Sequence, residues 1–308
     1  MLVPYLPKSD SHDMKWFIPA KTFLLGEYAA VLGHPAIVLT TTPCFELTLS
    51  NHSGLQGIHI DSPAGRFWDA HMVQEKGLKW HDPYQGHGGM GASSAQFLGA
   101  YLAMMSLQKQ RMNKDHLLST YIKYAWSGEG ICPSGYDVLA QSSYGCIYID
   151  GPGSFGHPFA WPFQELGFLL IHTGQKLATH HHLQAMTLPS QMDPLAAIVL
   201  EAKVAFENAD SDSMIRTVNA YHLQLLHMGL VAKHSMKYLA LLKEEQDVLA
   251  VKGCGAMGAD ILLLLVPKYR ENLMYQRLST KGWKVLATSE QLYQAELAKN
   301  NPDKRLEF

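Results

Sequence analysis

Residues 86–95, which read GHGGMGASSA, constrain the fold of this chain more than any other segment. Glycines let the backbone turn its N–H groups inward and approach an anion closely, as a phosphate-binding loop requires. The apolar residues 95–107 that follow predict a long buried helix, beginning at Ser93, whose N-terminal amides would face that anion. No Gly-Lys-Ser/Thr follows, so this is not a Walker loop, and the glycine spacing differs from a dinucleotide fingerprint. A plain glycine loop with a serine cap is the alternative.

The composition is that of an ordinary globular protein that binds small ligands. The chain has 308 residues, of which 47% are hydrophobic and 17% are charged, and its formal net charge is −2. Because there is no basic surplus, we expect no nucleic-acid partner and no anionic membrane partner. Any anionic ligand must be held locally, by a few lysines and by backbone amides.

Cysteine usage and hydropathy indicate a cytoplasmic protein. The four cysteines are far apart and form no CxxC pair, which argues against a disulfide framework and a structural zinc site. The first residues lack the basic start and apolar run of a signal peptide. The longest apolar stretch, residues 261–267, is much shorter than the roughly 20 residues that span a bilayer. A small molecule is the expected partner, and a homodimer is left open.

Strand-like and helix-like segments are mixed without strict alternation, which favours the α+β class over a doubly wound sheet. Residues 54–65 are expected to form a short strand with a hairpin connection, and residues 151–162, rich in Gly and Pro, are the best linker candidate. The predicted strands are residues 16–18, 36–42, 144–149, 167–172, 248–250 and 261–266. The predicted helices after the glycine-rich segment are residues 117–126, 194–208 and 213–230.

Three further segments stand in a fixed order around the glycine-rich loop. Residues 19–31 read PAKTFLLGEYAAV and are followed by GHPAI, residues 133–137 read PSGYD, and residues 252–260 read KGCGAMGAD. Together with the loop, they resemble the ordered motifs of the GHMP kinases, in particular those of mevalonate and phosphomevalonate kinases. One motif alone would be weak evidence, but the ordered set covers most of the chain.

The resemblance implies a fold and a cofactor. It implies a ribosomal-protein-S5-like N-terminal domain, residues 1–160, that carries the phosphate loop, and a ferredoxin-like C-terminal domain, residues 161–308. ATP with Mg²⁺ would lie between them, its phosphates against Gly88, Gly89, Gly91, Ala92, Ser93 and Ser94. Ser93 matches the serine that is expected near Mg²⁺.

The resemblance also implies catalytic and substrate residues. Asp137 would accept a proton from an acceptor hydroxyl, and Lys21 would lie near Asp137 and stabilise the developing alkoxide. Glu27 could orient Lys21 through an ion pair, or could be a solvated turn carboxylate. The residues assigned to the substrate side are Glu27, Ser134, Gly135, Lys176, Thr179, Gly255 and Ala256.

The sequence departs from the family pattern at several positions. Met257 and Ala259 replace glycines of the third motif, and Ala92 stands in place of a serine. The acidic Mg²⁺ ligand would fall on Trp126, which cannot bind a metal, so Glu129 is the substitute if the loop is shorter. These departures motivate a second hypothesis, a catalytically silent nucleotide-binding regulator. The retention of Lys21, Ser93 and Asp137 argues against that hypothesis.

The motifs favour phosphomevalonate over mevalonate as the acceptor. GEYA at residues 26–29, SGYDVLA at residues 134–140 and TGQKLAT at residues 173–179 look like the phosphomevalonate enzymes, whereas GHPAI and PSG look more like mevalonate kinase. A phosphomonoester is largely anionic at neutral pH, because its second pKa is about 6, and so needs cations more than a base. Lys176 and the three histidines of residues 180–182 could supply cations, although such a triplet is more often a surface loop.

Overall fold

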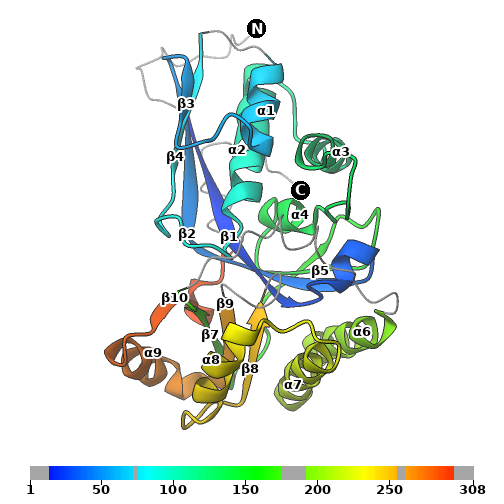
Figure 1. Cartoon of the computed structure of the whole chain (residues 1–308), viewed down its shortest axis with the longest axis vertical. Coiled ribbons are helices and arrows are strands. Elements are labelled where there is room, and N and C mark those ends of the chain that lie inside the picture. Colours follow the sequence, from blue (N-terminus) through cyan, green and yellow to red (C-terminus); the bar gives the residue numbers. More distant parts are fainter. Residues whose placement is uncertain (1–13, 72–74, 175–191, 255–260, 295–308) are drawn as a thin grey trace, which may run out of the picture.

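The computed structural model describes residues 14–71, 75–174, 192–254 and 261–294. Two lobes are stacked along the long axis of the molecule, each built on its own sheet (Figure 1). The first sheet has six strands and the second has four. Among the described residues, no helix combines the length and the apolar character needed to cross a bilayer.

The first sheet is organised around the long strand β2, Ala36–Ser50, whose many β-branched residues suit an extended backbone. Strand β1, Lys15–Leu25, pairs antiparallel with β2 along one edge. The opposite edge of β2 pairs with β4, Gly77–His81, at one end and with β5, Cys146–Ile149, at the other. Two short strands complete the sheet: β3, Gly54–Gln56, runs parallel to β4, and β6, His157–Phe159, pairs with β5.

Four helices lie beside the first sheet: α1, Pro63–Ala70; α2, Ala92–Leu107; α3, Lys114–Ala125; and α4, Tyr136–Gln141 (Figure 1). Helix α2 is apolar on nearly all sides, and such a helix is stable only when surrounded. Phe97, Ala100 and Tyr101 are fully buried accordingly. The glycine-rich segment therefore leads into an anchored helix, which fixes where the N-terminus of that helix lies.

The second sheet has the strand order β10-β7-β9-β8, and all its neighbours are antiparallel. Its strands are β7, Leu166–His172; β8, Ala250–Cys254; β9, Ile261–Pro267; and β10, Lys284–Thr288. Helices α6, Asp193–Asn208, α7, Ser211–His227, and α8, Lys233–Lys243, connect β7 to β8, and α9, Glu271–Thr280, connects β9 to β10. This order, with helical connections after the first and third strands, is ferredoxin-like.

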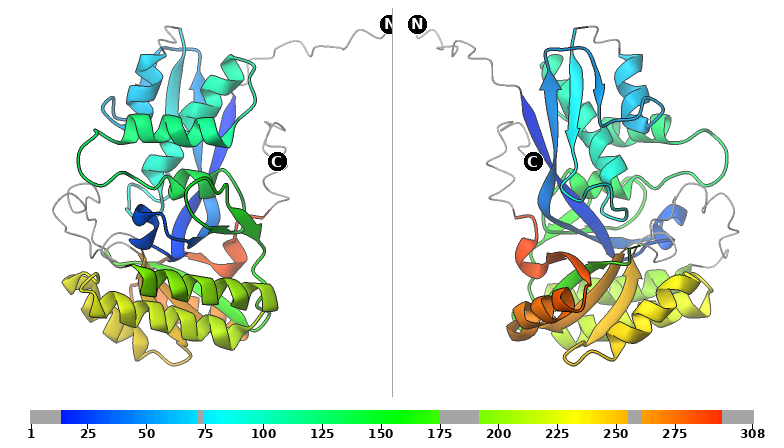
Figure 2. Two further views of the ribbon diagram at one scale, coloured as in Figure 1. Left: turned by 90° about the vertical axis from the view of Figure 1, so that its right-hand side faces the viewer. Right: turned by 60° about the vertical axis from the view of Figure 1, so that its left-hand side comes forward.

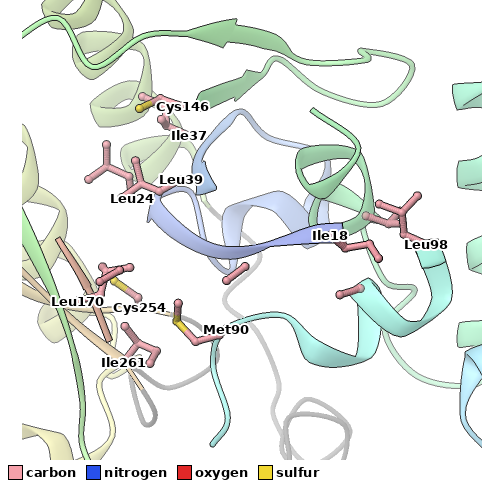
Figure 3. Packing of buried hydrophobic residues seen from close by; sticks show 14 of the residues in the cluster. Ile18, Leu24, Ile37, Leu39, Met90, Leu98, Cys146, Leu170, Cys254 and Ile261 are labelled. Atoms are coloured by element: carbon pink, nitrogen blue, oxygen red, sulfur yellow. The ribbon is translucent and has the colours of Figure 1, made fainter. Parts of the chain in front are cut away.

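Both faces of the second sheet are covered, which explains why β9 is a continuous apolar run. Leu169 and Ile171 face a cluster with α8 and α9, whereas Phe168 and Leu170 belong to the main core. That main core continues into the first lobe. Leu24 of β1 and Met90 of the glycine-rich segment lie near Leu170, Cys254 and Ile261 (Figure 3). The two lobes therefore share one hydrophobic core instead of meeting at a wet interface.

The structure corrects two sequence predictions about local structure. Residues 54–65 do not form a strand with a hairpin: only Gly54–Gln56 is extended, its pairing with β4 is parallel, and α1 begins at Pro63, where Ser62 caps the helix. The expected linker at residues 151–162 contains β6, which pairs with β5. The proline in β6 lies at the edge of the sheet, where a missing N–H is tolerated.

The chain passes from the first sheet to the second between Phe159 and Leu166. It then returns after β10: the N–H of Tyr293 donates to the carbonyl of Thr40, and the N–H of Gly145 donates to the carbonyl of Tyr293. β10 accordingly lies at the junction of the lobes in both views of Figure 2. A domain boundary at residues 160–161 stays a prediction, and the end of the described chain packs on the first sheet.

Candidate active site

Lys21 connects strand β1 with the glycine-rich segment and with helix α4. It lies within β1 and is only 8% exposed. Its Nζ is 2.7 Å from Oδ1 of Asp137, and its backbone N–H donates to the carbonyl of Met90 at 3.0 Å. A buried ammonium is costly unless it is paired, and Asp137 supplies the partner. The position of Lys21 next to Asp137 agrees with the sequence expectation.

Asp137 lies in the first turn of α4, where a carboxylate interacts favourably with the helix amides. Gly135 precedes the helix in the left-handed conformation, with φ of 72°, and the Oγ of Ser134 accepts a hydrogen bond from the N–H of Tyr136. The Asp137 side chain is one-third exposed. It can therefore reach a ligand while it remains paired with Lys21. Ser134 and Gly135, assigned to the substrate side, shape this turn.

The glycine-rich segment makes a close approach to Lys21 possible. Gly91 immediately precedes α2 with φ of 79°, and a Cβ on it would lie 2.7 Å from Cγ of Lys21 and 3.0 Å from Nε2 of Gln141. Gly89 also has a positive φ, 86°. The first amides of a helix have no intrahelical acceptor and can bind an anion. An anion at the start of α2 would therefore lie close to the Lys21–Asp137 pair.

The two serines at the start of α2 have different environments. The Ser94 side chain is buried, and its Oγ donates to the carbonyl of Gly91 at 3.0 Å. The Ser94 hydroxyl therefore bonds to the loop, and its backbone amide belongs to the first turn of α2, where amides have no intrahelical acceptor. Ser93 is exposed, and its hydroxyl is accessible to a ligand. Ala92 and Gly88 are half-buried.

Gln141 belongs to the candidate site, although no sequence motif includes it. Its Nε2 donates to the carbonyl of Pro19 at 2.9 Å and to the carbonyl of Gly91 at 3.1 Å. The amide thereby clamps the end of the glycine-rich segment to the start of β1. Gln141 follows Asp137 by four residues, so both lie on one face of α4, and this spacing is the signal that could have identified it.

The ion pair of Glu27 differs from the predicted one. Its Oε1 is 2.6 Å from Nζ of Lys252 on β8, and the two side chains are 3% and 0% exposed. Lys21 instead pairs with Asp137. Glu27 is therefore neither a partner of Lys21 nor a solvated turn carboxylate. Because it is buried and already paired, direct contact with a substrate is not supported.

A second contact between the lobes involves His87 of the glycine-rich segment. Its Nδ1 lies against the backbone carbonyl of Tyr84. The ammonium of Lys284, on β10, is 3.3 Å from Nδ1 and 3.2 Å from Nε2 of the same ring. The ring of His172, at the end of β7, meets the His87 ring edge-on with a centroid separation of 4.8 Å. Sequence patterns do not predict this contact, because its residues lie in three separate segments.

Acid is expected to weaken the fold through His172. Burial lowers the pKa of this imidazole to about 4, with His87 and Lys284 adding to the effect. A histidine whose folded pKa lies below its unfolded value of 6.5 stabilises the protein above pH 6.5, and this contribution is lost as the pH falls toward 4. Over this pH window, we expect the free energy of unfolding of wild type to fall relative to that of His172→Asn by at most about 1.4 kcal/mol per pH unit. Urea unfolding of both proteins at pH 7.5, 6 and 5 measures the difference, and a constant gap at all three values would contradict it.

The metal assignment stays a prediction. Glu129 is exposed in the segment between α3 and α4, where its backbone carbonyl accepts a hydrogen bond from Nε1 of Trp126. The described residues hold no group of three His, Cys, Asp or Glu side chains that could bind a metal ion. Four of the assigned residues lie outside the described part of the chain, namely Lys176, Thr179, Gly255 and Ala256, as do the three histidines at residues 180–182.

Comparison with known proteins gives structural but not sequence matches. No protein-family model and no curated sequence matches this chain. Among solved structures, Streptococcus pneumoniae phosphomevalonate kinase in complex with phosphomevalonate and AMPPNP superposes with a TM-score of 0.74 at 14% identity, over 89% of this chain and 99% of that one. L. major mevalonate kinase in complex with R-mevalonate superposes with a TM-score of 0.69 at 19% identity, over 94% of this chain and 99% of that one. The chain has the GHMP kinase fold.

Other members of this fold match almost as well. Lactococcus lactis galactokinase in complex with galactose gives a TM-score of 0.66 at 12% identity, over 89% of this chain and 93% of that one. The GHMP kinase fold confirms the α+β prediction, including the ferredoxin-like second sheet. Because kinases for several acceptors share the fold, the acceptor has to be argued from the site.

Proposed function

We propose that this protein is an ATP-dependent kinase of a small isoprenoid-precursor acid, with phosphomevalonate as the first candidate acceptor. The observation that carries the proposal is the Lys21–Asp137 pair beside Gly91 at the start of α2. A phosphoryl transfer needs positioning and charge neutralisation more than covalent chemistry. A cation, a carboxylate and a set of free helix amides within one small region can supply both.

The nucleotide would lie against the glycine-rich segment. Positive φ at Gly89 and Gly91, an exposed Ser93, and the amides of the first turn of α2 fit a chain of phosphates. Mg·ATP supplies the phosphoryl group, with the metal bound mainly through phosphate oxygens and water, as Mg²⁺ commonly is. Ser93 is the residue of this segment that could add a ligand to it. Lys21 would stabilise the negative charge on the oxygens between donor and acceptor.

The role of Asp137 depends on the acceptor. A phosphomonoester is already an anionic nucleophile, so Asp137 would mainly hold Lys21 in place. A hydroxyl acceptor needs a base within hydrogen-bond reach, and a carboxylate that is one-third exposed can serve. The geometry of the pair is thus also suited to mevalonate, which is the second candidate.

A coupled assay of ADP release with Mg·ATP tests the proposal against five conditions: phosphomevalonate, mevalonate, galactose, homoserine and no acceptor. We expect turnover above the no-acceptor rate with phosphomevalonate. Turnover with mevalonate alone would establish the second candidate. Turnover confined to galactose or homoserine would refute the isoprenoid assignment. ATP binding without ADP release in any condition would support the silent regulator instead.

A further inference from the structure

The Glu27–Lys252 ion pair joins the two lobes and lies outside the proposed chemistry. Glu27 follows β1 in the first lobe, whereas Lys252 lies at the centre of β8 in the second. The two atoms Oε1 and Nζ are 2.6 Å apart, and both side chains are almost fully buried. Cys254 lies 3.6 Å from Nζ, but burial raises the pKa of its thiol to about 11, so it is neutral at pH 7. Glu27 is therefore the acidic partner of Lys252; burial raises the pKa of its carboxyl, and the Lys252 ammonium 2.6 Å away opposes that effect.

Two tyrosines reinforce the contact between the lobes at the same place. The hydroxyl of Tyr221, on α7, donates to the backbone carbonyl of Glu27 at 2.9 Å, and its ring lies 5.6 Å from Nζ of Lys252. The hydroxyl of Tyr28 donates to the carbonyl of Leu230 at 3.1 Å. The turn after β1 is thus attached to the second lobe by one ion pair and two hydrogen bonds.

The backbone of this turn is strained. Tyr28 has φ of 65° and ψ of −50°, a conformation that a bulky residue rarely adopts. Such strain costs on the order of 1–3 kcal/mol and persists only where the surroundings impose it. Here the surroundings are the Glu27–Lys252 ion pair and the hydrogen bond from the Tyr28 hydroxyl to the carbonyl of Leu230. The local conformation is therefore set by contacts from the other lobe.

Stability alone does not account for two buried charges. Removing an ion from water costs several kcal/mol, and well-packed apolar residues often replace a buried pair without loss of stability. What an ion pair adds is a directional contact that fixes how two elements lie against each other. Glu27 is six residues after Lys21 on the same segment, so a shift of this turn against β8 would be transmitted along β1 to the Lys21–Asp137 pair.

We propose that Glu27 and Lys252 are positioning residues that hold the two lobes in the register required for phosphoryl transfer. The inference rests on the proposed function. It predicts that the pair affects the chemical step more than the binding of each ligand. A misplacement of about 1 Å can lower a rate on the order of 100-fold while contacts within each lobe are kept.

The test replaces the pair by apolar residues of similar length, Glu27→Met with Lys252→Met. The control is Lys15→Met with Glu46→Met, which removes an ion pair of the same 2.6 Å length that lies at the surface and within one lobe. We expect the double variant at Glu27 and Lys252 to melt within a few degrees of wild type. Its kcat should fall by about 10- to 100-fold, with KM for ATP and acceptor within about threefold. The control variant should keep the melting temperature, the kcat and both KM values of wild type.

Two further measurements keep the inference testable. Glu27→Gln is nearly isosteric, so if the double variant fails to fold, a folded Glu27→Gln protein with wild-type kcat would overturn the inference. Hydrogen exchange needs no turnover: we expect exchange of Ala29–Leu32 and of β8 to increase in the variant but not in the control. Unchanged exchange, or wild-type kcat in a folded variant, contradicts the positioning role. A wild-type protein that releases no ADP with any acceptor refutes the proposed function instead.

Discussion

Replacing Lys21 by methionine is expected to lower the turnover of this protein by about 100- to 1,000-fold. The substitution keeps the apolar stem, which packs within β1, but removes the cation that is 2.7 Å from Asp137. Asp137 is one-third exposed, so water can solvate it when its partner is gone, and the fold should survive. The rate of ADP release and the dissociation constant for ATP are the two measurements.

A matched control is available on the same strand. Lys15 of β1 also pairs with a carboxylate, Glu46, but the two side chains are 47% and 24% exposed and neither contacts Asp137 in an ion pair. Lys15→Met should change turnover by less than about twofold, since exposed pairs contribute little. Equal turnover in Lys21→Met and Lys15→Met would refute the assignment of Lys21. Comparison with Asp137→Asn then addresses the acceptor: a loss of about 100- to 10,000-fold indicates a base for a hydroxyl, and a smaller loss indicates a positioning role.

Replacing Gly91 by alanine is expected to lower turnover by about 100-fold. A Cβ at this position would lie 2.7 Å from Cγ and 3.0 Å from Cε of Lys21, so the lysine side chain would have to shift, and we expect its pairing with Asp137 to be disturbed. It would also crowd Nε2 of Gln141, which clamps the end of the segment to β1. Thermal unfolding should show a moderate loss of stability, and ADP release a much larger loss of rate.

Gly86 provides the comparison that separates crowding from backbone strain. Its φ of 77° is close to the 79° of Gly91, but a Cβ on Gly86 would meet no atom within 4 Å. Gly86→Ala should therefore lose about 1 kcal/mol of stability, as an unfavourable φ predicts, and keep most of its turnover. Similar losses of turnover in both variants would show that backbone strain, and not the approach to Lys21, explains the effect.

The parts of the fold that the sequence predicts well are those with a strong local pattern. The glycine-rich segment followed by apolar residues predicts α2, and the runs at residues 167–172 and 261–266 predict β7 and β9. Residues 54–65 were misassigned, because their short alternating pattern concealed a helix start at Pro63 that Ser62 caps. The strand within residues 151–162 was missed for a different reason. His157–Phe159 contains a proline, and only its pairing with β5 makes it a strand.

The candidate site likewise contains residues that a local motif predicts and residues whose contacts depend on tertiary packing. Lys21 and Asp137 are identifiable because each stands in a short motif, and the helix start explains why anions would gather there. The partner of Glu27 was assigned incorrectly, because the nearest lysine along the chain is Lys21, whereas its partner Lys252 reaches it only through the packing of the second lobe. Gln141 and the His87–Lys284 contact depend equally on tertiary structure. Sequence motifs identify residues with a chemical role, but long-range packing decides their partners.

The most direct test of the proposed function is phosphorus NMR of wild-type protein incubated with Mg·ATP and phosphomevalonate. We expect the γ-phosphate signal of ATP to be replaced by the signals of ADP and, in equal molar amount, of a new diphosphate ester on the acceptor. Formation of inorganic phosphate in place of the diphosphate ester would show hydrolysis without transfer. That result, or an unchanged spectrum with bound ATP, would contradict phosphoryl transfer to phosphomevalonate.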